Sequence, residues 1–99
     1  MAIVQPAYIA LPYATQTHLR LTANAVVKAS RGVVATVNVL VAGSAPSQIH
    51  DSATVSGASA ANQVASIPNV VGTYVMNFPC FNGITFVHGT AQEVSISFS

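Results

Sequence analysis

The sequence predicts an all-β protein, a single β-sandwich or jelly-roll-like domain of about seven or eight strands with an extended N-terminal arm. Two observations support this fold class. Apolar and polar residues alternate with a period of two in several short stretches, which is typical of half-buried strands. Glycines separate these stretches, as turn residues do in sandwiches. The glycines are Gly32, Gly43, Gly57, Gly72, Gly83 and Gly89.

Residues 1–18 are predicted to form the extended arm, and residues 19–99 the β-sandwich domain. Pro6 and Pro12 disfavour helix at the residue before each of them, and residues 1–18 contain neither glycine nor charge. Either the arm lies across a neighbouring subunit, or part of it is the first core strand of its own subunit. Large apolar side chains in the arm are costly to leave in water, so we treat them as candidate inter-subunit contacts. They are Ile3, Val4, Tyr8, Ile9, Leu11 and Tyr13.

The first half of the domain is predicted to hold three strands. In the first strand, Leu19, Leu21 and Ala23 alternate with polar residues and share one face. A second strand spans residues 25–30. The longest run, residues 33–42, is largely apolar on both faces, so we expect a central strand covered by a second sheet or by a neighbouring subunit. One of its faces is expected to carry Val33, Ala35, Val37, Val39 and Val41.

The middle of the chain gives weaker patterns. A turn at residues 43–46 precedes a short strand expected at residues 47–51. Residues 60–67 have the spacing of a short helical turn before Pro68, and a loose strand is equally compatible with them. A better strand follows at residues 74–78, and Pro79 marks a bulge or an edge position.

The C-terminal part contains the clearest strand. Asn82-Gly83 predicts a hairpin that joins residues 78–81 to residues 84–87. The last strand, residues 93–98, alternates strictly between apolar and polar side chains. Its predicted inward residues are Val94, Ile96 and Phe98.

The composition favours a part of an assembly over a solitary enzyme. The chain of 99 residues is 52% hydrophobic, its mean hydropathy is +0.56 and only 5% of its residues are charged. A free cytosolic domain has about a quarter of its residues charged, and these charges keep copies apart. Ser, Thr, Asn and Gln supply the polarity instead, and they line subunit contacts without the desolvation cost of ions. The charged residues are Arg20, Lys28, Arg31, Asp51 and Glu93.

No catalytic, cofactor-binding or metal-binding residue is predicted. His18, His50 and His88 have no ligand spacing to one another or to Cys80. His50 and Asp51 are neighbours in a strand and therefore point to opposite faces, which argues against a Ser-His-Asp triad. Cys80 has no nearby cation in the sequence to activate its thiol, and a single cysteine forms no intrachain disulfide. We therefore expect neither an enzyme nor a small-molecule substrate.

Membrane and nucleic-acid partners are not expected either. No apolar run approaches the roughly 20 residues of a membrane span, and no basic residue precedes Arg20 as a secretory signal would require. The net charge of +1 is too small for a nucleic-acid surface. We expect synthesis in a cytoplasm.

The C-terminal half resembles small tailed-bacteriophage and prophage virion structural proteins of the head-decoration, or cement-like, β-sandwich kind. The resemblance lies in a Gly-Thr turn and a last strand in which serines alternate with apolar residues. It is carried by residues 61–68, 71–80, 82–84, 89–90 and 93–98.

This resemblance implies a capsid decoration protein that stabilises contacts between capsid subunits. Its partners would be the major capsid protein and copies of itself, most simply in a homotrimer, and its location would be the capsid surface of the virion after synthesis in the host cytoplasm. The alternative is a tail-fibre, neck or receptor-binding module that recognises host surface glycan. Stacking on a sugar would then involve the aromatic residues Tyr8, Tyr13, Tyr74 and Phe81.

Overall fold

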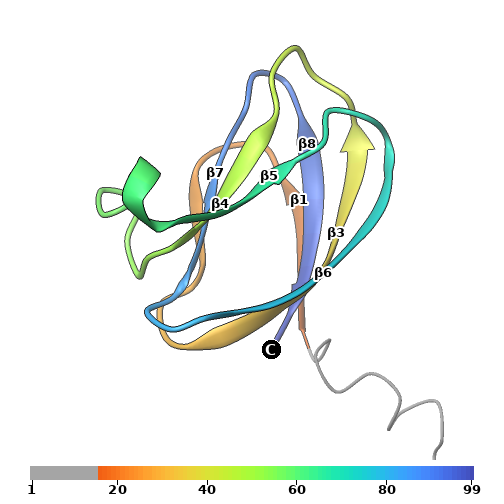
Figure 1. The fold of residues 1–99 in the computed structure, drawn as a ribbon. Coiled ribbons are helices and arrows are strands. Elements are labelled where there is room, and N and C mark those ends of the chain that lie inside the picture. The colour runs from red at the N-terminus through yellow and green to blue at the C-terminus, as the bar shows by residue number, and fades with distance from the viewer. Residues whose placement is uncertain (1–15) are drawn as a thin grey trace, which may run out of the picture.

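Eight strands and one short 3-10 helix make up residues 16–99, the part of the chain that the computed structural model describes. Figure 1 shows their arrangement. In chain order the elements are β1 (Gln16–Leu21), β2 (Ala25–Lys28), β3 (Gly32–Val41), β4 (Ser47–Asp51), the 3-10 helix η1 (Ala60–Asn62), β5 (Gln63–Ile67), β6 (Gly72–Cys80), β7 (Ile84–Val87) and β8 (Glu93–Phe98).

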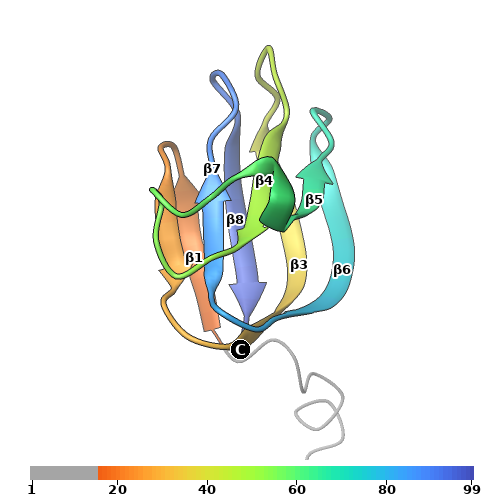
Figure 2. The ribbon, with the colours of Figure 1, turned by 60° about the vertical axis from the view of Figure 1, so that its left-hand side comes forward.

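The strands form two four-stranded antiparallel sheets that pack face to face (Figures 1 and 2). Sheet A has the order β1-β8-β3-β6, and sheet B has the order β2-β7-β4-β5. The pairs are nested: β4 pairs with β5, β3 with β6, β2 with β7 and β1 with β8. The chain is therefore one long antiparallel hairpin whose successive pairs alternate between the sheets. This is the jelly-roll topology, and it confirms the predicted all-β fold class.

The core lies between the sheets and is built from the inward residues of the central strands. Val37 and Val39 of β3 and Ile96 of β8 contribute from sheet A, and Ile49 and Phe86 contribute from sheet B. All five are fully buried or nearly so. The predicted inward face of the last strand, Val94, Ile96 and Phe98, is confirmed.

The predicted inward faces of two strands were wrong. In each strand an irregular residue interrupts the alternation, so the residues beyond it point to the opposite face from the one predicted. In β3 the register shifts between Val34 and Thr36, so the core side carries Val34, Val37 and Val39 and not one unbroken alternation. In β1 the register shifts between His18 and Leu21, and Arg20 has a positive φ of 42°. Leu19 therefore faces solvent, whereas Leu21 is buried.

The predicted Asn82-Gly83 hairpin was also wrong. The strands on either side, β6 and β7, belong to different sheets, so residues 81–83 cross from one sheet to the other. The Asp51 carboxylate, at the end of β4, accepts hydrogen bonds from the backbone N–H groups of Asn82 (2.7 Å) and Gly83 (3.4 Å). A side chain on Gly83 would meet the Lys28 carbonyl oxygen at 2.8 Å, so glycine is needed here for close approach and not for a hairpin turn.

The other predicted strands agree with the structure to within a few residues at their ends. Residues 60–67 contain both predicted alternatives, the helical turn η1 and the strand β5. Pro79 lies on β6, which is an edge strand of sheet A. The strand β1 begins at Gln16, within the residues predicted as arm. The six candidate inter-subunit contacts of the arm lie outside the described residues.

Candidate interaction surfaces

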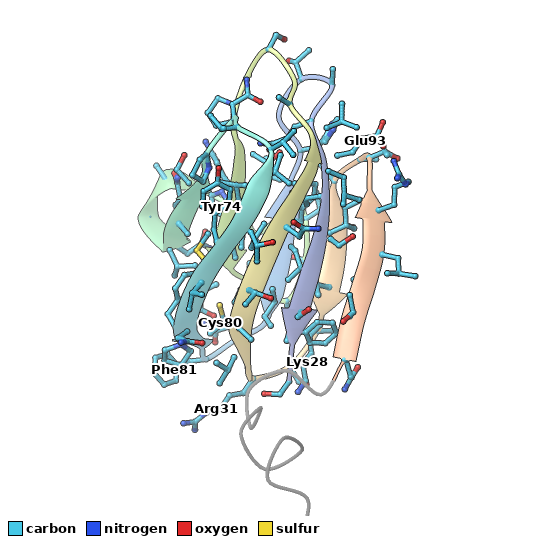
Figure 3. All side chains as sticks on the ribbon, turned by 90° about the vertical axis from the view of Figure 1, so that its right-hand side faces the viewer. Lys28, Arg31, Tyr74, Cys80, Phe81 and Glu93 are labelled. Carbon is cyan, nitrogen blue, oxygen red and sulfur yellow. The ribbon has the colours of Figure 1, made fainter. Side chains whose placement is uncertain are left out.

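The charged residues lie toward the two ends of the sandwich. Arg20 of β1 forms an ion pair with Glu93 of β8 at one end. Lys28 and Arg31 lie at the other end, as Figure 3 shows, and Asp51 is held there by the 81–83 connection. The sequence contains no charge between Asp51 and Glu93, so β5, β6 and β7 carry none.

The outer face of sheet A is open and carries small polar side chains together with two exposed apolar ones, Leu19 and Val75. The hydroxyls of Thr17 and Ser97 lie 3.2 Å apart across β1 and β8. The Thr73 hydroxyl of β6 donates a 2.9 Å hydrogen bond to Asn38 Oδ1 of β3. Such uncharged groups cost less to dehydrate than ions do, and neighbours in the sheet already satisfy part of their hydrogen bonding. The face can therefore be covered by a protein partner at low cost.

The outer face of sheet B is covered by the connection between β4 and β5. His50 points to this face, because its neighbour Ile49 points into the core, yet the imidazole is buried. Its ring nitrogens lie 2.9 Å from Asn62 Oδ1 and 2.9 Å from Gln48 Oε1. The Thr85 hydroxyl donates to the Ser52 carbonyl oxygen at 2.7 Å. Figure 2 shows the connection passing in front of this sheet, so sheet A offers the open face.

Exposed valines gather along the side of the sandwich where β5 and β6 are the edge strands. We call β5, β6 and the loop between them the β5–β6 margin. Val75 lies on the outer face of β6 and is 70% exposed. The exposed apolar residues of this margin are Val64, Val70, Val71 and Val75. Because the margin carries no charge, it is the most apolar exposed edge of the described sandwich.

The loops at one end are joined by two amide side chains. Gln92 is fully buried; its Oε1 accepts from Ser47 N at 3.0 Å and its Nε2 donates to the Pro68 carbonyl at 2.8 Å. Asn69 bonds both backbone groups of Gly43, at 2.7 Å and 2.6 Å. Sequence reasoning missed both residues, because a polar residue next to a turn is ordinarily read as solvated. Their effect is to fix this end of the sandwich.

The residues considered for catalysis have separate partners. The amides of Asn62 and Gln48 hold His50, whereas the carboxylate of Asp51 accepts from the backbone N–H groups of the 81–83 connection. Burial opposes ionisation of Asp51, but these hydrogen bonds outweigh it, so the pKa of the carboxyl is lowered from its usual value. The structure therefore does not join His50 and Asp51 as a catalytic pair.

Cys80 is fully buried at the end of β6. Burial, with a smaller contribution from the nearby Asp51 charge, raises the pKa of the thiol to about 11. The reactive thiolate is therefore scarce at neutral pH. Among residues 16–99, no group of three or more His, Cys, Asp and Glu side chains is placed to hold a metal ion. His18 Nδ1 is buried without a hydrogen-bond partner among these residues.

Of the aromatic residues considered for glycan stacking, two lie in the described part of the chain. Phe81 is exposed at one end of the sandwich, and the Arg31 guanidinium lies 5.2 Å from the centroid of its ring. Tyr74 is half-buried along β6 and donates a 2.7 Å hydrogen bond to the Val70 carbonyl. Figure 3 shows them at different heights along the molecule. Tyr8 and Tyr13 lie outside the described residues.

The class of protein that the fold defines is an eight-stranded jelly roll with one open and one covered sheet. No protein-family model, curated protein or solved structure matches the chain. In residues 16–99 no helix has the length and hydropathy needed to span a membrane. One fold serves many functions, so the exposed surfaces of this sandwich carry the information on its function.

Proposed function

We propose that this chain is a non-enzymatic virion structural protein, a capsid decoration (cement) protein that stabilises contacts between capsid subunits. The observation that carries the proposal is the open outer face of sheet A. It joins small polar side chains, such as Asn38, Thr73 and Ser97, to the exposed Leu19 and Val75, and it bears charge only at the Arg20–Glu93 pair. A face of this kind suits permanent coverage by protein, because little charge has to be dehydrated.

Two further features support this proposal. Jelly rolls occur in viral capsid proteins and in lectins, so the topology is compatible with a virion part. The chain has few charges to keep copies apart in solution, which fits a protein held by many repeated contacts. Its partners in this proposal are the major capsid protein and copies of itself, arranged as a homotrimer on the capsid surface.

The test is binding to emptied capsids from which decoration proteins have been removed, measured by sedimentation at low and at high salt. We expect the protein to sediment with the assembled lattice and not to bind loose capsid subunits, because a site built where several subunits meet exists only after assembly. Salt should change this binding little, because uncharged contacts are barely screened.

Matched variants locate the surface. Ser97→Lys places a charge on the open face of sheet A, and Val55→Lys places one on the connection that covers sheet B. Ser97→Lys should weaken capsid binding at least tenfold, whereas Val55→Lys should leave it unchanged. Binding to host envelopes but not to capsids would contradict the proposal and favour the glycan-binding alternative, in which the exposed Phe81 would contact sugar.

A further inference from the structure

The free edge of β6 differs from the other exposed edges of the sandwich. Within residues 16–99, β6 pairs with β3 alone, so alternate backbone N–H and C=O groups along its other side have no strand partner. With 9 residues it is the longest of the four edge strands; β1 has 6, β2 has 4 and β5 has 5.

Soluble proteins usually protect such an edge by shortness, charge, proline or a bulge. In β6 the register shift, the positive φ of Asn77 (53°) and Pro79 all lie in the second half. The first half, residues 72–76, has a regular ladder to β3 over residues 72–75 and contains no charge and no proline. This half is therefore open to a further strand.

The surroundings of this half-strand fit an apolar and uncharged occupant. Val75 is exposed on the outer face of β6, and Val70 and Val71 are exposed in the loop that leads into it. On the inner face, Tyr74 and Met76 pack against the core but are only half-buried. A strand added here would cover side chains on both faces of sheet A.

We propose that residues 7–11 of a neighbouring copy add a strand to this edge, antiparallel to residues 72–76 of β6. The donor run is Ala7-Tyr8-Ile9-Ala10-Leu11, which is uncharged and lies between Pro6 and Pro12. Proline lacks the backbone donor, so the two prolines limit the ladder to the five residues between them. The acceptor half of β6 before Asn77 has the same length.

Side-chain alternation favours one register for this pairing. With Tyr8 opposite Val75, the aromatic ring covers the exposed valine on the outer face, since opposed residues share a face. Ile9 then lies opposite Tyr74, and Leu11 lies opposite Gly72. These two large apolar side chains would cover the half-buried inner side of the edge.

The reach of the chain requires that the donor comes from another copy. Five residue steps separate Leu11 from Gln16, and an extended chain spans at most about 18 Å over them. From Gln16 at the start of β1, the new strand lies four strand spacings away across sheet A, about 19 Å. Leu11 would also lie level with Leu21, since sheet pairing places Leu21, Val94, Val39 and Gly72 in one row.

The rise from Gln16 to Leu21 adds about 16 Å along the strand direction. The total separation is then about 25 Å, beyond the reach of the five steps. Pairing in trans makes each copy both donor and acceptor. Such a head-to-tail contact closes into a ring when the rotation between copies allows it, as in the proposed homotrimer. The inference thus rests on the proposed assembly role and names the contact that would hold it together.

The test mixes two full-length variants that each add one cysteine to the native Cys80, Tyr8→Cys and Val75→Cys, under mild oxidation. We expect disulfide-linked dimers that contain one copy of each variant, identified by mass spectrometry, because opposed cross-strand residues are within disulfide distance. Ala10→Cys is a second donor on the same face. The native Cys80 is buried with a raised pKa, so the parent protein should remain uncrosslinked.

Leu19 supplies the matched acceptor control. It is 74% exposed on β1 at the opposite edge of the same sheet, against 70% for Val75. Tyr8→Cys mixed with Leu19→Cys should give at least fivefold less cross-linked dimer. In sedimentation, Val75→Lys should shift the oligomer to monomer and Leu19→Lys should not, and circular dichroism should show both variants folded.

Any one of four outcomes would overturn the inference. Cross-links found only between two Val75→Cys chains would indicate that two β6 edges pair with each other. Equal cross-linking to Leu19→Cys would indicate random collision. An intrachain disulfide in a variant that carries both Tyr8→Cys and Val75→Cys would show pairing in cis. Capsid binding without a Tyr8–Val75 cross-link would contradict the strand exchange alone, whereas the cross-link without capsid binding would contradict only the cement function.

Discussion

At the scale of single residues, the buried amide of Gln92 and the partly exposed carboxylate of Asp51 both bind backbone groups of distant segments. Gln92 connects β4 to the loop before β6, and Asp51 connects β4 to the loop after β6. Both fix loops that join strands of different sheets. In this sandwich, hydrogen bonds from polar side chains fix the connections between the two sheets, whereas within one sheet a hairpin turn fixes the connection between strands.

Replacing Gln92 with leucine should destabilise the fold strongly. The change leaves the buried Ser47 N without its acceptor and removes the donor to the Pro68 carbonyl. A buried unsatisfied group costs about 1 to 3 kcal/mol and a lost hydrogen bond about 1 kcal/mol, so we expect a loss of about 2 to 4 kcal/mol in urea unfolding. The control Gln63→Leu, at an exposed position of β5, should stay within about 0.5 kcal/mol of the parent. Equal losses in both variants would contradict this role of Gln92.

Asp51 should make stability fall at acid pH. Its folded-state pKa is lowered, so its contribution is present above the unfolded pKa of about 3.9 and is lost as the pH falls through the folded value. Asp51→Asn should therefore be less stable than the parent at pH 7, and the difference should shrink below about pH 4. Urea unfolding of both proteins across this range is the measurement. A difference that stays constant with pH would show that the carboxylate charge is not what holds Asn82 and Gly83.

At the scale of elements, strict alternation is reliable only where no irregular residue interrupts it. In β8, Val94, Ile96 and Phe98 all face the core, as the alternation predicts. In β3 and β1 a register shift interrupts the alternation, so the prediction of which residues face the core is wrong there. Irregularities of this kind increase strand twist and bend, which a small two-sheet sandwich requires.

The last strand allows a test with adjacent residues. Ile96→Asp would bury an unpaired carboxylate in the core and should cost several kcal/mol, a large share of the stability of a small domain. Ser97→Asp places the same carboxylate one residue later on the outer face and should cost far less. Thermal midpoints of the two variants give the comparison. Similar midpoints would mean that the register of β8 is wrong.

At the scale of the whole molecule, the two sheets have different exposure. The 52–62 connection covers sheet B, whereas the described residues leave the outer face of sheet A and the free edge of β6 open. The arm predicted in residues 1–18 would supply apolar groups for such a surface. Contacts between this open surface and the apolar arm of another copy would need few charged residues.

Deletion of residues 1–13 should separate folding from assembly. All eight strands and the core lie within residues 16–99, so circular dichroism of the shortened chain should retain the β spectrum. Sedimentation should show loss of the oligomer, because the candidate contacts in the arm are removed. Burial of each large apolar side chain contributes about 1.5 to 3 kcal/mol, enough to offset part of the ordering cost of an extended segment. Joint loss of fold and oligomer would mean that the arm is a core strand of its own subunit.

The sequence by itself determined the all-β class, most strand positions and the near absence of charge. These features are local: alternation, glycine and proline positions, and composition. For residues 60–67 the local pattern allowed a short helical turn or a strand, and the structure contains one after the other.

Only the tertiary structure decided which strands share a sheet. Asn82-Gly83 has the local pattern of a hairpin, but the Asp51 carboxylate and the close backbone contacts of Gly83 turn it into a crossover between sheets. Likewise, Gln92 lies next to a turn in sequence. In the fold it is buried and binds Ser47 N and the Pro68 carbonyl, because distant loops meet around it. The sequence also does not show that β6 is an edge strand, because this depends on which strands pair with it in the folded protein. Pairing between distant segments sets these features, and local patterns do not encode it.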